Sequence, residues 1–235
     1  MAKLRKPPAI IPSLDLNLED ATDLLSDLAD VEDKIAAYKV SSLQVLEMGL
    51  EKVLEELRAY TSLPLIYDHQ KACTDIPAIV TNQVDAVASL GIDSFIAVPQ
   101  GAGSKSLENF VKASKKNKII PVVLLEMTHP GANDYLKENT PSKVFDKAVE
   151  LGVKHFVVPG NKTEKINQYR CWADKGNKNI RLLSPGIGAQ GGTAEAAVKA
   201  GVDYPIIGRA IYTAEKPAEA VQKIYDACKK GYNKR

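Results

Sequence analysis

The densest group of reactive side chains lies in residues 67–77, where one lysine stands between two aspartates. Two residues separate Asp68 from Lys71, and three separate Lys71 from Asp75. Carboxylates on both sides of an ammonium group keep the lysine protonated and make it a proton donor. A carboxylate at such a site can also repel an anionic group of a substrate. The alternative interpretation, a surface ion pair, would contribute little to stability.

A second group of residues is typical of a phosphate site. Residues 184–192 read Ser-Pro-Gly-Ile-Gly-Ala-Gln-Gly-Gly, and Arg209 directly follows Gly208. Glycines leave backbone N–H groups open to an anion, and an arginine can bind two phosphate oxygens at once. A glycine turn beside an ordinary arginine is the plainer interpretation, but two separate segments carry the signal. Because the P-loop pattern is missing from the sequence, we expect a phosphate ester bound without a P-loop.

Eight short apolar runs alternate with longer amphipathic stretches. Continuous apolar runs are typical of strands buried on both faces of a parallel sheet. The expected strands are residues 9–15, 37–40, 63–68, 94–98, 119–126, 155–158, 181–185 and 205–208. The expected helices are residues 18–28, 43–57, 106–113, 142–151, 164–173, 193–200 and 217–229.

Eight strand–helix units of roughly 30 residues each predict a (β/α)8 TIM barrel, an α/β fold. Residues 1–235 form a single domain in this interpretation, with 1–8 as an N-terminal extension and 229–235 as a solvated tail. A doubly wound open sheet is the alternative fold. That fold usually has fewer strands and often carries a Gly-x-Gly-x-x-Gly turn after the first one. Here Asp15 follows the first strand, without a glycine.

Polar residues that end the apolar runs are expected to meet at one face of the barrel. Catalytic groups of this fold lie at the carboxyl ends of the strands. Each residue alone could be a solvated loop charge, but acids and bases at nearly every strand end indicate an active site. The set comprises Asp15, Lys39, Asp68, Lys71, Glu126, Thr128, His129, Ser184 and Arg209.

The overall composition argues against several classes of protein. Lysine and arginine number 31 against 29 acidic residues, so no strongly basic face for nucleic acid is expected. No apolar run approaches the roughly 18 residues of a membrane helix. Cys73, Cys171 and Cys228 lie far apart, and we expect buried or half-buried thiols in a reducing, cytoplasmic compartment. The three histidines form no zinc motif, so a zinc site is not expected, although Mg²⁺ could still bind through carboxylates and a phosphate.

The chain resembles the orotidine 5′-phosphate decarboxylases over almost its whole length. The motifs that carry the resemblance are Asp68 with Lys71 and 75–77, Glu-Met-Thr-His-Pro-Gly-Ala at 126–132, the glycine-rich segment 184–192, and Gly-Arg-Ala-Ile-Tyr at 208–212. The resemblance implies metal-free decarboxylation of orotidine 5′-phosphate to uridine 5′-phosphate in pyrimidine biosynthesis. It also implies the (β/α)8 fold and the absence of a cofactor.

The resemblance further implies roles for the acidic and basic residues. Lys71 looks like the lysine that protonates C6 after carbon dioxide leaves, and Asp68 like the carboxylate beside the substrate carboxylate. Asp75 looks like the aspartate lent by the other subunit. The segment that begins at Thr81 resembles the partner segment that touches the ribose, which implies a homodimer with shared sites.

The remaining roles concern the nucleotide itself. Asp15 and Lys39 match residues that bind ribose hydroxyls and tie the charged network together, and Thr128 takes the place usually held by serine against the pyrimidine amide. The phosphate would be bound by Gln190 and Arg209 on loops that also contain Pro185, Gly188 and Gly208.

The aspartate–lysine segment departs from the family pattern. The usual spacing is Asp-x-Lys-x-x-Asp, whereas this chain has one extra residue in each gap. In a regular strand Asp68 and Lys71 would point to opposite faces. A bulge or turn near His69 must therefore redirect Lys71 if its role is retained.

Two other functions stay open at this point. One is a sister enzyme on the same scaffold, a keto-sugar-phosphate decarboxylase or hexulose-phosphate synthase, which would use Mg²⁺ held by carboxylates and a phosphate. The other is a nucleotide-binding barrel without chemistry, for which the altered spacing is the sequence support. Activity that survives a chelator would favour the metal-free reaction.

Overall fold

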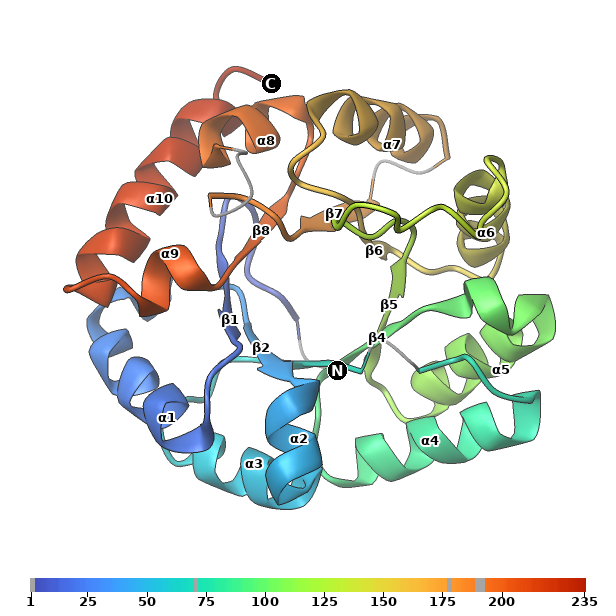
Figure 1. Cartoon of the computed structure of the whole chain (residues 1–235), viewed down its shortest axis with the longest axis horizontal. Coiled ribbons are helices and arrows are strands. Elements are labelled where there is room, and N and C mark those ends of the chain that lie inside the picture. The colour runs from blue at the N-terminus through green and yellow to red at the C-terminus, as the bar shows by residue number, and fades with distance from the viewer. Residues whose placement is uncertain (1–2, 70–71, 177–178, 189–192) are drawn as a thin grey trace.

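Eight parallel strands close into a barrel, as the apolar runs predict (Figure 1). The structure is a computed structural model that describes residues 3–69, 72–176, 179–188 and 193–235. Each strand pairs with its neighbours in sequence, and β1 pairs with β8, so the open-sheet alternative is wrong. The strands are β1 (Ile11–Leu14), β2 (Tyr38–Ser41), β3 (Leu65–Asp68), β4 (Ser94–Ala97), β5 (Ile120–Leu124), β6 (His155–Val157), β7 (Arg181–Ser184) and β8 (Tyr204–Ile207).

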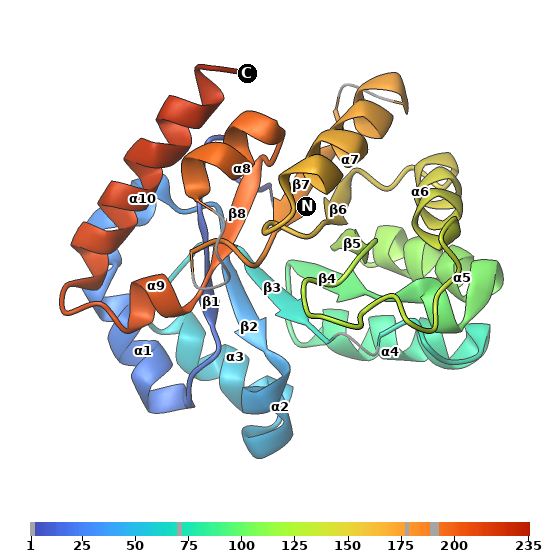
Figure 2. The ribbon, with the colours of Figure 1, turned by 45° about the horizontal axis from the view of Figure 1, so that its top comes forward.

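Helices surround the barrel and follow the strands in order (Figures 1 and 2). They are α1 (Leu18–Asp27), α2 (Ser42–Met48), α3 (Leu50–Arg58), α4 (Pro77–Ser89), α5 (Gly103–Lys116), α6 (Thr140–Glu150), α7 (Thr163–Gly176), α8 (Ala194–Ala200), α9 (Arg209–Tyr212) and α10 (Pro217–Tyr232). Two short 3₁₀ helices, η1 (Ala29–Lys34) and η2 (Pro99–Gly101), complete the connections.

The region of residues 43–57 differs from the single helix that its leucines predict. Gly49 has a φ of +80°, which interrupts the helical backbone between α2 and α3. Glycine adopts this left-handed conformation without the steric cost that other residues meet. The helix α4 is absent from the predicted set, although Pro77 stands in its first turn.

Strand β5 illustrates how the core is divided. Val122 and Leu124 belong to the apolar cluster inside the barrel, whereas Val123 belongs to the cluster between the strands and the helices. Successive side chains of a strand point to opposite faces, so one continuous apolar run supplies both layers. Each such side chain contributes about 1.5–3 kcal/mol by leaving water.

The two ends of the chain pack against the amino ends of the strands, which form the floor of the barrel. Arg5 donates from Nε to the Ile35 carbonyl oxygen at 3.2 Å, and the Tyr204 hydroxyl donates to the Arg5 carbonyl oxygen at 2.8 Å. Most of the predicted solvated tail is exposed, namely residues 229, 230 and 233–235, but part of it is ordered against the barrel. Helix α10 runs to Tyr232, and Arg235 pairs with the buried Asp203 at 3.1 Å.

Candidate active site

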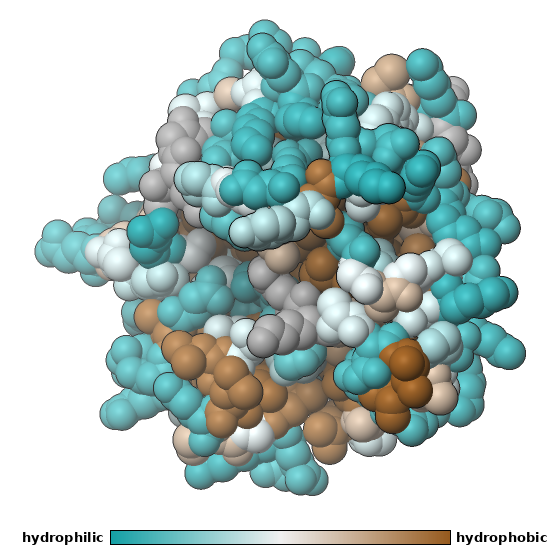
Figure 3. Space-filling model, turned by 45° about the vertical axis from the view of Figure 1, so that its right-hand side comes forward, coloured by the Kyte–Doolittle hydropathy of each residue, from teal (hydrophilic) through white to brown (hydrophobic). Residues whose placement is uncertain are grey.

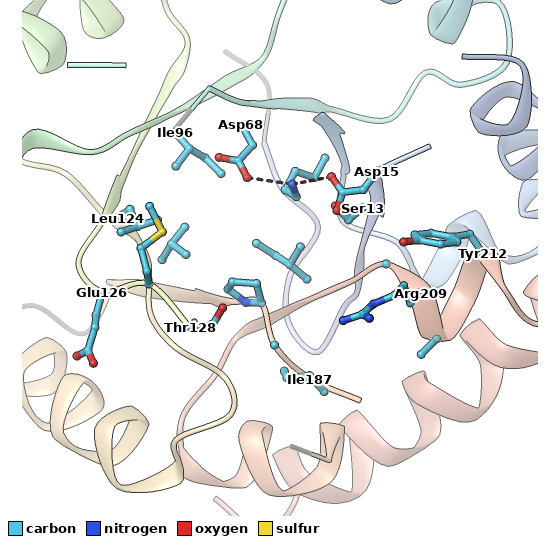
Figure 4. A pocket seen from close by; sticks show the side chains of 18 residues that line it. Ser13, Asp15, Asp68, Ile96, Leu124, Glu126, Thr128, Ile187, Arg209 and Tyr212 are labelled. Atoms are coloured by element: carbon cyan, nitrogen blue, oxygen red, sulfur yellow. Dashed lines mark hydrogen bonds and ion pairs between the residues drawn. The ribbon is translucent and has the colours of Figure 1, made fainter. Parts of the chain in front are cut away.

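A pocket of about 220 Å³ opens at the mouth of the barrel, where the carboxyl ends of the strands meet (Figure 4). This is the face at which the polar strand ends were predicted to converge. Apolar side chains form its base, and three polar regions surround them. The lining residues are Ser13, Asp15, Lys39, Asp68, Ile96, Leu124, Glu126, Met127, Thr128, Val157, Pro185, Gly186, Ile187, Ile206, Gly208, Arg209, Ala210 and Tyr212.

The first polar region is a lysine held between two carboxylates from neighbouring strands. The Lys39 ammonium lies 2.9 Å from Oδ2 of Asp68 and 3.3 Å from Oδ1 of Asp15. Lys39 is 8% exposed and Asp68 is 7% exposed, whereas Asp15 is open to solvent. A buried cation is costly unless it is paired, and here two strand ends supply the partners.

The charge of Lys39 is set by these neighbours. Burial alone would lower the pKa of the lysine, but the nearby carboxylates of Asp68 and Asp15 outweigh burial and raise its pKa. The residue is therefore a permanent cation at neutral pH and cannot act as a base there. It can hold Asp68 and Asp15 in fixed positions.

Sequence reasoning missed Ser13, which lies on β1 two residues before Asp15. Its hydroxyl donates to Oδ2 of Asp15 at 2.7 Å, and both side chains line the pocket. The alternation of β1 is the signal that could have found it, because residues two apart in a strand share a face. Ser13 thus fixes the carboxylate oxygen that Lys39 does not contact.

The second polar region comes from the segments after β7 and β8. Arg209 points into the pocket across from Asp68 in Figure 4, and Gly208 precedes it. A Cβ atom added to Gly188 would lie 3.5 Å from Cβ of Ala210, so the two segments touch. Gly188 has a φ of +86°, a conformation that favours glycine. This side could bind an anionic group.

The third polar region lies after β5, where Thr128 and Met127 face the pocket. The Thr128 carbonyl oxygen accepts a hydrogen bond from Nδ2 of Asn161 at 3.3 Å. The Glu126 side chain points away from the pocket in Figure 4 and is fully buried. The Ser184 hydroxyl connects two strand ends, since it donates to the Val158 carbonyl oxygen at 2.7 Å.

Two of the predicted site residues, Lys71 and Gln190, lie outside the described residues. Of the described residues around Lys71, Ala72 donates a hydrogen bond from its backbone N–H to the carbonyl oxygen of His69 at 2.7 Å. Cys73 follows with a φ of +67°, so the described backbone at residue 73 is not that of a strand. The bulge or turn that would redirect Lys71 stays a prediction.

Asp75 and Thr81 are not brought to the pocket of their own chain. Asp75 is exposed and accepts a hydrogen bond from the Ile76 N–H at 2.7 Å. Thr81 lies on α4, donates to the Pro77 carbonyl oxygen at 3.1 Å, and accepts from Nδ2 of Asn109 at 3.1 Å.

No cysteine or histidine is among the residues that line the pocket. Cys73 and Cys228 are buried, and burial raises the pKa of each thiol to about 12. Cys171 is exposed, so the expectation of buried or half-buried thiols is wrong there.

Within the described ranges, no three His, Cys, Asp or Glu side chains gather as a metal site. Those ranges also contain no helix both long and apolar enough to cross a membrane.

Together the fold and the pocket define a (β/α)8 barrel whose mouth joins a buried carboxylate–lysine array to an arginine and a glycine-rich segment. Residues 8–224 match the model of the orotidine 5′-phosphate decarboxylase / HUMPS family. The chain belongs to this family, as its sequence motifs indicate.

Known relatives cover nearly the whole chain. The orotidine 5′-phosphate decarboxylase of Pyrococcus furiosus is 39% identical over 218 residues, which cover 92% of this chain and 96% of the relative. That of Thermococcus kodakarensis is 35% identical over 91% of this chain and 94% of its own. A crystal structure of the Methanocaldococcus jannaschii enzyme with the inhibitor BMP superposes with a TM-score of 0.81 at 28% identity, covering 94% of this chain and 98% of that one.

Proposed function

We propose that this chain removes carbon dioxide from orotidine 5′-phosphate and releases uridine 5′-phosphate, without a metal or another cofactor. The observation that carries the proposal is the Lys39 ammonium held between Asp68 and Asp15, across the pocket from Arg209. One side of the pocket thus offers carboxylates and the other a cation for a phosphate. Relatives that match 92% and 91% of this chain are named for the same reaction.

The reaction breaks the bond between C6 of the pyrimidine and its carboxylate. The bonding electrons stay on C6 as carbon dioxide leaves, and the Lys71 ammonium then transfers a proton to C6. The resulting amine regains a proton from solvent. An ammonium fixed beside C6 stabilises the negative charge as it develops and then supplies the proton.

Asp68 acts on the substrate carboxylate, and Lys39 keeps Asp68 in place. A carboxylate beside the scissile carboxylate destabilises the bound substrate, and this repulsion is relieved when carbon dioxide departs. Because Asp68 is buried and 2.9 Å from Lys39, it cannot easily swing away. Asp15 and Lys39 would also contact the ribose hydroxyls.

The phosphate contributes at a distance from the reacting bond. Arg209 and Gln190, with the loops that contain Pro185, Gly188 and Gly208, would bind it. Energy from this remote contact can offset the desolvation and strain at C6. Thr128 would contact the pyrimidine amide and so select the base.

A homodimer would complete the site, with Asp75 and Thr81 supplied by the partner subunit. Several large apolar side chains on α2 and at the start of α4 are exposed to solvent, and hydrophobic surface gathers in the lower half of Figure 3. They include Leu43 at 55%, Leu46 at 80%, Ile76 at 63% and Ile79 at 39% exposure. A surface of this kind marks an interaction site, and two of these side chains, Ile76 and Ile79, closely follow Asp75 in the chain.

The test is turnover of orotidine 5′-phosphate, followed by ultraviolet absorbance with a chelator present. We expect activity in the parent, loss of activity in Lys71→Ala, and full activity in Lys112→Ala, an exposed lysine on α5. Activity that needs Mg²⁺ would favour the sister enzymes. Tight binding of uridine 5′-phosphate without turnover would favour a binding protein and remove Lys71 from the proposed role.

The shared site has its own test, in which inactive Lys71→Ala and Asp75→Ala chains are mixed and allowed to exchange subunits. Half of randomly formed dimers are mixed, and each mixed dimer has one intact site out of two. Activity should therefore return to about a quarter of the parent value. If both lesions fall within one chain's own site, mixing restores nothing.

A further inference from the structure

Glu126 is a buried carboxylate at the mouth of the barrel that no step of the proposed reaction uses. It lies two residues beyond β5, and its side chain is 0% exposed and directed away from the pocket. Its neighbours in sequence, Met127 and Thr128, line the pocket. A buried carboxylate is retained only where hydrogen bonds or opposite charges compensate for lost hydration.

Partners from two separate segments surround this carboxylate. The Tyr169 hydroxyl of α7 donates to Oε2 at 2.6 Å, and Nδ2 of Asn133 donates to Oε1 at 3.1 Å. The ammonium groups of Lys162 and Lys165 lie 3.3 and 3.7 Å away. Burial would raise the pKa of Glu126, but the hydrogen bond from Tyr169 and these neighbours outweigh burial and lower its pKa.

These contacts fix the β5–α6 loop, which we define as residues 125–139, to α7. Glu126 holds the start of the loop, and Asn133 joins the middle of the same loop to the same carboxylate. Tyr169 is 1% exposed and packs edge-on against Trp172, with ring centroids 5.1 Å apart. The hydroxyl that binds Glu126 therefore has little freedom to move.

We propose that Glu126 and Tyr169 are positioning residues that set the affinity for the base by holding Thr128 in place. The inference rests on the proposed function, in which Thr128 contacts the pyrimidine amide. In this proposal neither side chain touches the nucleotide, because the Glu126 carboxylate is directed away from the pocket and Tyr169 does not line it. Loss of the tyrosine hydroxyl removes the hydrogen bond to Oε2 and leaves that oxygen the longer ion pair with Lys165 at 3.7 Å. The loop is then held less firmly, and a shift of well under 1 Å is enough to weaken a hydrogen bond from Thr128.

The first experiment measures ligand binding to the Tyr169→Phe variant. Uridine 5′-phosphate should bind about tenfold more weakly, the upper end of the effect of losing one hydrogen bond between uncharged groups, here Thr128 and the pyrimidine amide. Ribose 5-phosphate, which lacks the base, should keep its affinity within about twofold. The matched control is Tyr204→Phe, which removes a hydroxyl from another buried tyrosine at the floor of the barrel and should change neither affinity.

The second experiment combines Tyr169→Phe with a change in the pocket. In the Thr128→Val background, Tyr169→Phe should cost less than about twofold in uridine 5′-phosphate affinity, because the contact it positions has been removed. In the Arg209→Ala background, Tyr169→Phe should still lower the affinity for uridine 5′-phosphate about tenfold. Residues that act through one contact are coupled, whereas independent sites are additive.

The outcomes separate this inference from the function on which it rests. Equal weakening of both ligands by Tyr169→Phe, or no weakening, would overturn the positioning role while leaving the reaction intact. Full additivity with Thr128→Val would overturn it as well. If the parent does not bind uridine 5′-phosphate, or Thr128→Val leaves its affinity unchanged, the proposed function or the role of Thr128 fails, and the inference fails with it.

Discussion

The mouth and the floor of the barrel each contain a buried cluster of charges, and the two are built differently. At the mouth, one lysine, Lys39, serves two carboxylates, Asp15 and Asp68. At the floor, one carboxylate, Asp203, forms ion pairs with three arginines. The distances are 3.1 Å to Arg170, 3.5 Å to Arg181 and 3.1 Å to Arg235. The first cluster faces a cavity, whereas the second lies outside it.

In the floor cluster, both oxygens of the Asp203 carboxylate are bound by groups of the protein itself. Asp203 is 1% exposed, and its Oδ2 also accepts the Leu182 N–H at 2.9 Å. Its partners on β7, on α7 and beyond the end of α10 are thereby joined to the residue just before β8. Such a cluster organises structure. At the mouth, by contrast, Asp15 remains open to solvent, so the same kinds of side chain stay available to a ligand.

The largest expected effect is on activity, in Lys39→Met. Methionine nearly keeps the length of the side chain but removes the cation between Asp68 and Asp15. We expect kcat/KM to fall on the order of a thousandfold, because a preorganised charge is lost from the site. Steady-state kinetics measure the fall. Lys216→Met, which breaks an exposed pair with Glu219, should leave kcat/KM unchanged, and an active Lys39→Met would show that the mouth cluster is structural.

The next effect is on stability, in Asp203→Asn. The substitution leaves three arginines without their carboxylate, and breaking a buried pair costs about 3 kcal/mol. Denaturant unfolding should show this loss, with kcat/KM kept within about twofold. An Asp203→Asn variant as stable as the parent would contradict a structural role for the floor cluster. A variant that stays folded but loses kcat/KM would contradict the assignment of the chemistry to the mouth alone.

The alternation of apolar runs was sufficient to predict the barrel and the face that carries the site. All eight strands are confirmed, and Asp15, Lys39, Asp68 and Thr128 line one pocket because each lies within, ends or follows a parallel strand. Local sequence determines which residues end a strand. The closed topology then brings these ends together, so no long-range contact had to be known in advance.

Contacts between distant residues account for what the sequence did not reveal. Glu126 pairs with Tyr169, 43 residues away, and Arg235 pairs with Asp203, 32 residues away. Nothing local to either residue indicates these partners. Helix α4 was missed for another reason: Ile79 on its outer side is exposed, so the helix lacks the single apolar stripe that marks a surface helix.

The smallest predicted effect concerns the pH dependence of stability and belongs to the floor. His155, the first residue of β6, is half-buried. Burial lowers its pKa to about 4, and the positive charges of Arg181 and Lys154 act in the same direction, against Asp203. Between about pH 6.5 and pH 4 the unfolded chain binds a proton here that the folded chain does not. The free energy of unfolding should therefore fall as the pH falls through this window.

This slope is at most about 1.4 kcal/mol per pH unit, the value for one proton. Denaturant unfolding at pH 7, 5.5 and 4.5 measures it, and His155→Gln should flatten the curve relative to the parent. His129→Gln, at an exposed histidine of the mouth, should not. Equal slopes in His155→Gln and the parent would mean that the acid sensitivity originates elsewhere. A flattened slope in His129→Gln would instead place it at the mouth, where binding of uridine 5′-phosphate should then change with pH over the same window.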